Sequence, residues 1–125
     1  MFNPYAMSVV DRIINGIVNC HTLRELDEIL HSLPVQDILL DTLPRDLRFK
    51  VRCILSLGML TDVIKQQGNI DYLRGLIANQ LSQFNEPDEM QCSRVICNLM
   101  DNISSFRDEN SIILEFRRIG ELLSN

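Results

Sequence analysis

Apolar residues recur along most of the chain at the three- and four-residue spacings of an amphipathic helix. The first such stripe runs from Val9 to Val18. It follows Asn3, which can cap the start of a helix, and Pro4, which can occupy the first turn. Similar stripes follow as far as Leu123, separated by short polar breaks. The pattern predicts an all-α fold, a single orthogonal bundle of about six or seven short helices.

Capping residues, prolines and glycines set the expected ends of these helices. Thr22 and Glu25 have the spacing of a capping box, which predicts a helix start. Pro44 predicts the start of the longest helix, and Gly68 predicts the stop after it. The acidic segment Asn85–Glu89 predicts a further start. The expected helices span about residues 4–19, 23–33, 35–39, 44–65, 70–81, 87–103 and 109–123.

The stretch 53–64 is apolar nearly all round, which is the pattern of a buried helix. We expect it to be the central helix of the bundle. Gly58 within it is expected to let a neighbouring helix cross closely, because a mid-helix glycine otherwise costs about 1 kcal/mol. The core positions expected on the next two helices are Ile70, Leu73, Leu76, Ile77, Leu81, Met90, Val95, Ile96, Leu99, Met100 and Ile103.

The composition is that of an ordinary globular protein. The chain has 125 residues, of which 46% are hydrophobic and 23% charged, and we expect residues 1–125 to form a single helical domain. It carries 12 basic and 17 acidic residues, for a net charge of −5. An acidic balance weakens attraction to phosphate backbones and to anionic membrane surfaces. Nucleic acid and membrane are therefore not the expected partners.

The sequence indicates a protein of the cell interior. Its N-terminus lacks the basic start and apolar stretch of a secretion signal, and no apolar run is long enough to span a bilayer. The four cysteines have no spacing that suggests a disulfide framework. We expect Cys20, Cys53, Cys92 and Cys97 to be reduced, core-lining thiols in a cytoplasmic protein.

The motifs of catalysis and of cofactor binding are missing from the sequence. Cys20, His21 and His31 lack the paired spacing of a structural zinc site. The five glycines are scattered and form neither a P-loop nor a dinucleotide fingerprint. We therefore expect a non-enzymatic protein with no catalytic residues, no metal and no cofactor.

Two charged patterns remain as candidate binding surfaces. Arg45, Arg48 and Arg52 follow one another at spacings of three and four, which places three guanidinium groups on one helix face. The segment 22–41 holds five acids and one base, and its acidic helix face is a second candidate. Its residues are Glu25, Asp27 and Glu28. The arginines could instead face solvent or pair internally with the acidic segment, through residues such as Asp37 and Asp41.

These observations favour a small regulatory protein that acts by binding a partner protein, as an inhibitor, adaptor, chaperone or immunity protein. The identity of that partner and the oligomeric state are not readable from the sequence. The alternative is a helical nucleic-acid-binding regulator that uses the Arg45, Arg48 and Arg52 face, against which the net charge argues. No motif assigns the chain to a known family.

Overall fold

The computed structural model describes residues 4–33, 40–65, 70–105 and 108–124. Within these ranges the chain is helical and contains no strand, which confirms the predicted all-α bundle. The elements are α1 (Pro4–Asn19), α2 (Leu23–Leu30), the 3-10 turn η2 (Leu40–Thr42), α3 (Arg45–Lys65), α4 (Ile70–Leu81), α5 (Pro87–Asn102), the 3-10 turn η3 (Ile103–Ser105) and α6 (Glu109–Leu123).

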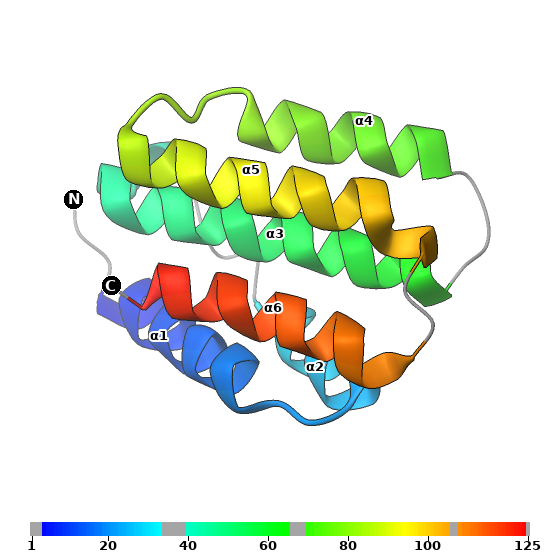
Figure 1. The fold of residues 1–125 in the computed structure, drawn as a ribbon. Coiled ribbons are helices and arrows are strands. Elements are labelled where there is room, and N and C mark those ends of the chain that lie inside the picture. Colours follow the sequence, from blue (N-terminus) through cyan, green and yellow to red (C-terminus); the bar gives the residue numbers. More distant parts are fainter. Residues whose placement is uncertain (1–3, 34–39, 66–69, 106–107, 125) are drawn as a thin grey trace.

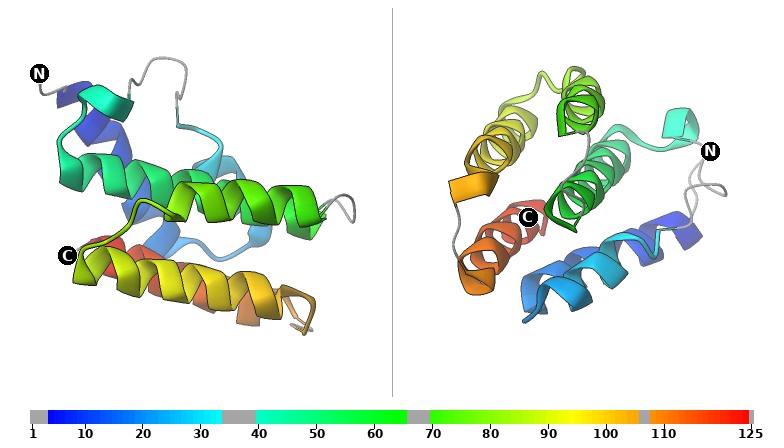
Figure 2. Two further views of the ribbon diagram at one scale, coloured as in Figure 1. Left: turned by 90° about the horizontal axis from the view of Figure 1, so that it is seen from above. Right: turned by 90° about the vertical axis from the view of Figure 1, so that its right-hand side faces the viewer.

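Helix α3 is the centre of the bundle, because it packs against α1, α2, α4 and α5. Figure 1 shows α3 behind α5, with α4 above it and α6, α1 and α2 below. Seen end-on in Figure 2, α3 lies between α4 and the pair formed by α1 and α2. Helix α1 packs mainly on α6 and α2. Among the described helices, none is long and apolar enough to cross a bilayer.

The burial of α3 confirms the central helix expected from its sequence. Ile54, Leu57 and Leu60 are fully buried, and between Cys53 and Val63 every position is buried or half-buried. The other helices each contribute one apolar stripe to this core. Among the side chains that the structure describes, the largest fully buried one is Phe116 of α6.

Among the described glycines, the tightest helix contact is at Gly120, not at Gly58. A Cβ atom at Gly58 would lie 3.7 Å or more from His31 and Leu30, which is ordinary contact distance. A Cβ atom at Gly120 would lie 2.8 Å from Cγ2 of Ile17, so the contact between α1 and α6 depends on that glycine. The sequence alone did not reveal this, because a helix contact depends on which helices pack.

Two expected core residues are exposed instead. The buried positions of α5 are Glu89, Cys92, Ile96, Leu99 and Met100, and Met90 is turned about 100° from Glu89 by the helix geometry. Met90 is accordingly 50% exposed. Ile70, in the first turn of α4, is 37% exposed, whereas Ile77 and Leu81 further along the stripe are buried. The expected helix at 35–39, the stop at Gly68 and the acid Asp37 lie outside the described residues.

The starts of α2 and α6 follow from their capping residues. The Thr22 hydroxyl accepts a hydrogen bond from the Glu25 amide at 3.1 Å, as the capping box predicts. The Glu25 carboxylate accepts from the amide of His21, one residue before the position that a capping box would use. Asp108 caps α6 by accepting from the Ser111 amide at 2.8 Å, which lowers the pKa of Asp108.

Candidate functional site

The three arginines of the predicted stripe lie along one groove, which we call the arginine groove. It runs between the first half of α3 and the loop that leads from α4 into α5. These two segments lie at the left of Figure 1. The groove has a volume of about 80 Å³. Its lining residues are Arg45, Arg48, Phe49, Arg52, Gln83, Phe84, Asn85 and Glu89. The aromatic rings of Phe49 and Phe84 meet edge to face, with centroids 5.1 Å apart, and join its two walls.

Arg45 is paired with the start of α5. Its guanidinium lies 3.1 Å from Oε1 of Glu89 and 3.6 Å from Oε1 of Glu86, and it also donates to the Asn85 side chain. Oε1 of Glu89 accepts two further hydrogen bonds, from the amides of Asn85 and Glu86. Burial by itself would raise the pKa of Glu89, but the hydrogen bond from Arg45, together with those from the two amides, holds it below its ordinary value. Glu89 thus fastens the first turn of α5 to α3.

The other two arginines have no carboxylate partner among the described residues. Arg52 donates to the side-chain oxygen of Gln80 at 3.0 Å, a neutral acceptor. Arg48 is half-buried and makes no hydrogen bond or ion pair through its side chain within the described part of the chain. The alternative of internal pairing with the acidic segment 22–41 is not seen for its described residues, since the acids that pair with Arg45 are Glu86 and Glu89 at the start of α5.

A larger cleft adjoins the arginine groove and shares Arg45, Phe49 and Glu89 with it. Its volume is about 540 Å³, and it lies between the starts of α3 and α5 and the end of α6. Its lining residues are Arg45, Asp46, Phe49, Glu86, Pro87, Asp88, Glu89, Gln91, Cys92 and Leu122. Four carboxylates face one guanidinium there, so the cleft is acidic where the groove is basic.

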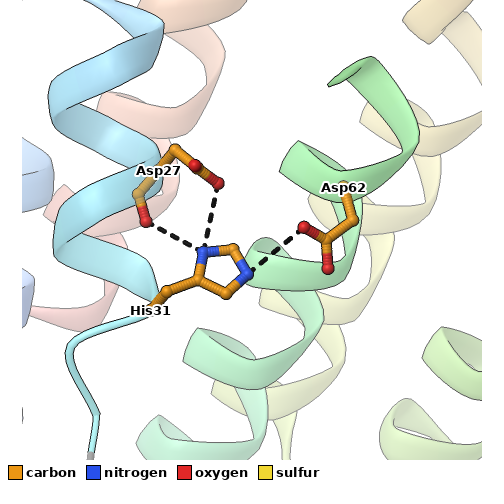
Figure 3. Close-up of side chains that lie close together, drawn as sticks. All are labelled: Asp27, His31 and Asp62. Carbon is orange, nitrogen blue, oxygen red and sulfur yellow. Dashed lines mark hydrogen bonds and ion pairs between the residues drawn. The ribbon is translucent and has the colours of Figure 1, made fainter. Parts of the chain in front are cut away.

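One residue of the acidic face of α2, Asp27, takes part in interactions within the molecule. Figure 3 shows His31 between Asp27 of α2 and Asp62 of α3. Nδ1 of His31 lies 2.8 Å from the backbone oxygen of Asp27 and 3.1 Å from its carboxylate, and Nε2 lies 3.3 Å from Asp62. Because a backbone oxygen can only accept, Nδ1 carries the hydrogen in this arrangement.

Asp27, His31 and Asp62 have ligand atoms within 4.8 Å of one another, the spacing of a metal-binding group. However, the ammonium of Lys65 donates to Oδ2 of Asp27 at 2.8 Å and lies 3.8 Å from Asp62. This hydrogen bond is the main cause that lowers the pKa of Asp27, and it raises the pKa of Lys65. The lysine already supplies the positive charge that the two carboxylates attract. We therefore interpret the cluster as an ion-pair network that joins α2 to α3.

Of the other predicted acidic residues, Glu28 pairs with Arg24 at 3.5 Å, and both side chains are largely exposed. Glu25 is exposed and caps the start of α2 through the His21 amide. Asp27 faces α3 rather than solvent, since its carboxylate binds Thr61 and Lys65. The three acids therefore do not share one free face.

The sequence did not single out the residues that complete these sites. Glu89 and Asp62 lie on helices other than those of their partners, so no spacing along the chain relates them to Arg45 or His31. The short interval from Glu86 to Glu89 was a usable signal for a capping interaction, although not for the arginine pairing. No family model, curated protein or solved structure matches this chain.

Proposed function

We propose that the chain is a non-enzymatic regulator that binds another protein by docking an acidic segment of that partner into the arginine groove. The observation that supports this most is the state of Arg48. It is half-buried in the groove and pairs with no carboxylate of the described residues, and its neighbour Arg52 is bonded to a neutral amide.

The charge of the groove complements such a segment. Three arginines and one glutamate line it, in a chain whose net charge is −5. A guanidinium presents paired N–H donors that match the two oxygens of a carboxylate. Arg48 and Arg52, one helical turn apart, are spaced to receive two neighbouring carboxylates.

The stability of the folded chain alone does not explain why three arginines lie on one helix face. Like charges one turn apart on a helix repel by about 0.2 to 0.5 kcal/mol per pair. Glu89 offsets this for Arg45, but no carboxylate among the described residues does so for Arg48 or Arg52. Carboxylates of a bound partner would offset the remaining repulsion.

The surroundings of the groove favour an acidic peptide segment over a nucleic acid. The adjoining cleft presents Asp46, Glu86 and Asp88 directly beside Arg45. A nucleic acid carries evenly spaced phosphates along its whole length, which would meet these carboxylates. A peptide can place carboxylates against Arg48 and Arg52 and neutral side chains elsewhere.

The test is a fluorescence anisotropy titration with a labelled glutamate peptide, in which two neighbouring glutamates stand among glycines and serines, alongside a peptide with glutamines at the same two positions. We expect the glutamate peptide to bind at low salt and to weaken as salt rises. The double variant Arg48→Glu/Arg52→Glu should lose this binding. The control variant Arg12→Glu/Arg118→Glu makes the same change in net charge at exposed sites on α1 and α6, and it should bind as the wild type does.

Equal binding of the glutamate peptide by the wild type and the Arg48→Glu/Arg52→Glu variant would contradict the proposal. So would equal loss in both double variants, because net charge alone would then govern binding. Tight binding of single-stranded DNA that depends on Arg48, without binding of the glutamate peptide, would support a nucleic-acid partner instead. Thermal melts of each variant verify that the fold is intact.

A further inference from the structure

The charge of the surface reverses across the Arg45–Glu89 ion pair. The arginine groove and the larger cleft beside it, which we call the acidic cleft, share Arg45, Phe49 and Glu89 as a common wall. On the groove side of this wall the charged lining residues are arginines, and on the cleft side they are carboxylates. A partner segment that crosses the ion pair therefore meets a basic surface on one side and an acidic surface on the other.

The carboxylates of the acidic cleft outnumber the basic side chains that neutralise them. Two of the four, those of Glu86 and Glu89, share a single guanidinium. Asp46 lies 3.7 Å from Lys50, but its side chain is 79% exposed, so solvent screens this pair. Asp88 is exposed and forms no ion pair with a described residue. The cleft thus keeps an excess of negative charge that a bound cation would neutralise.

The shape of the acidic cleft favours a long basic side chain over a small ion. Its volume of about 540 Å³ lies in the range of roughly 300 to 1,000 Å³ that is typical of ligand pockets. Phe49, Pro87 and Leu122 line it next to the carboxylates. A lysine or arginine packs its aliphatic stem on such apolar surface and keeps its charged end beside polar groups. A small ion would leave the apolar part of the cleft uncovered.

We propose that the acidic cleft receives a lysine or arginine of the same partner segment whose carboxylates bind Arg48 and Arg52. This rests on the function proposed above and adds a requirement to it, because the segment must carry two neighbouring acids and a base a short distance along its chain. Arg48 lies one helical turn, about 5.4 Å, from Arg45. An extended peptide advances about 3.3 Å per residue, so a base about two to four residues from the acids passes the ion pair and reaches the cleft.

The two halves of the surface select such a segment over a uniformly acidic one. Further carboxylates of the partner would lie against Asp46 and Asp88, which repel them. A base at that position replaces the repulsion with attraction. Opposite charges in a fixed order also set the direction in which the segment binds.

The experiment compares peptides of identical composition in the fluorescence anisotropy titration. Each carries two neighbouring glutamates and one lysine among glycines and serines. The lysine stands about three residues after the glutamates in one peptide, about three before them in a second, and about ten after them in a third, which is too far to reach the cleft from the groove along a short path. We expect one of the two near-lysine peptides to bind the wild type several-fold more tightly than the distant-lysine peptide.

Variants locate the source of this advantage. Asp46→Asn/Asp88→Asn should bring the ratio of the two dissociation constants close to one. The control Asp11→Asn/Asp101→Asn makes the same change in net charge at exposed sites outside the cleft and the groove, and it should keep the advantage. Equal binding of all three peptides by the wild type would overturn the proposal. An advantage that persists in Asp46→Asn/Asp88→Asn would overturn it as well.

The failure of this proposal is distinguishable from the failure of the proposed function. If binding is lost in Arg48→Glu/Arg52→Glu but the position of the lysine makes no difference, only the role of the acidic cleft is wrong. If no peptide binds the wild type, or if all bind Arg48→Glu/Arg52→Glu equally well, both are wrong. The comparison of the three peptides uses the wild-type chain, so it stands even if a variant fails to fold.

Discussion

Replacing Glu89 with alanine should lower the free energy of unfolding by about 2 kcal/mol. Oε1 of Glu89 accepts hydrogen bonds from the amides of Asn85 and Glu86, and each such bond contributes about 1 kcal/mol net. Loss of a capping side chain costs about 0.5 to 2 kcal/mol, which agrees with that sum. The ion pair with Arg45 adds less, because that guanidinium is half-exposed and screened by solvent.

Urea denaturation followed by far-UV circular dichroism measures this loss. Glu86→Gln is the matched control, because Glu86 approaches the same arginine from the same helix turn but is 60% exposed. It should change stability by less than about 0.5 kcal/mol. A loss below about 0.5 kcal/mol for Glu89→Ala, or equal losses for the two variants, would refute the role of Glu89 in capping the first turn of α5 through the amides of Asn85 and Glu86.

Three further predictions test the rest of the structure. Gly120→Ala should lose about 1 to 2 kcal/mol of stability, because its methyl group would lie 2.8 Å from Ile17. The control Gly75→Ala, in the exposed part of α4, should gain up to about 1 kcal/mol. Equal effects of the two variants in chemical denaturation would refute the close contact at Gly120. Ile54→Ala should cost about 2 to 5 kcal/mol in the same assay, and a loss under about 0.5 kcal/mol would mean that α3 is not central. Folding lowers the pKa of Asp27, so its contribution to stability is present above the ordinary value of 3.8 and is lost as the pH falls through the lower folded-state pKa. Asp27→Asn should therefore flatten the acid limb of a plot of urea midpoint against pH, and an unchanged limb would contradict the ion-pair network.

Local signals predicted the helices well because helix ends are determined by nearby residues. The first helix spans Pro4–Asn19 and the longest ends at Lys65, as the caps, prolines and periodicity indicate. The arginine stripe was also predictable, since spacings of three and four place side chains on one face. The residues that pair with that face could not be identified from the sequence, because they meet it only through the packing of α5 on α3.

The remaining features depend on contacts between helices, which periodicity does not specify. Met90 fits an apolar pattern on α5, yet the buried face of that helix is the one that carries Glu89 and Cys92. Asp62 reaches His31 for the same kind of reason, through the packing of α2 on α3.

The central claim is that the arginine groove receives carboxylates of a partner. Its most direct test is a titration of the isotopically labelled protein with the same two-glutamate peptide, followed by nuclear magnetic resonance of the arginine side chains. We expect saturable shifts of the Nε–Hε signals of Arg48 and Arg52, with no shift for Arg12 or Arg118. Shifts of similar size at all four arginines, or shifts confined to Arg12 and Arg118, would contradict the claim.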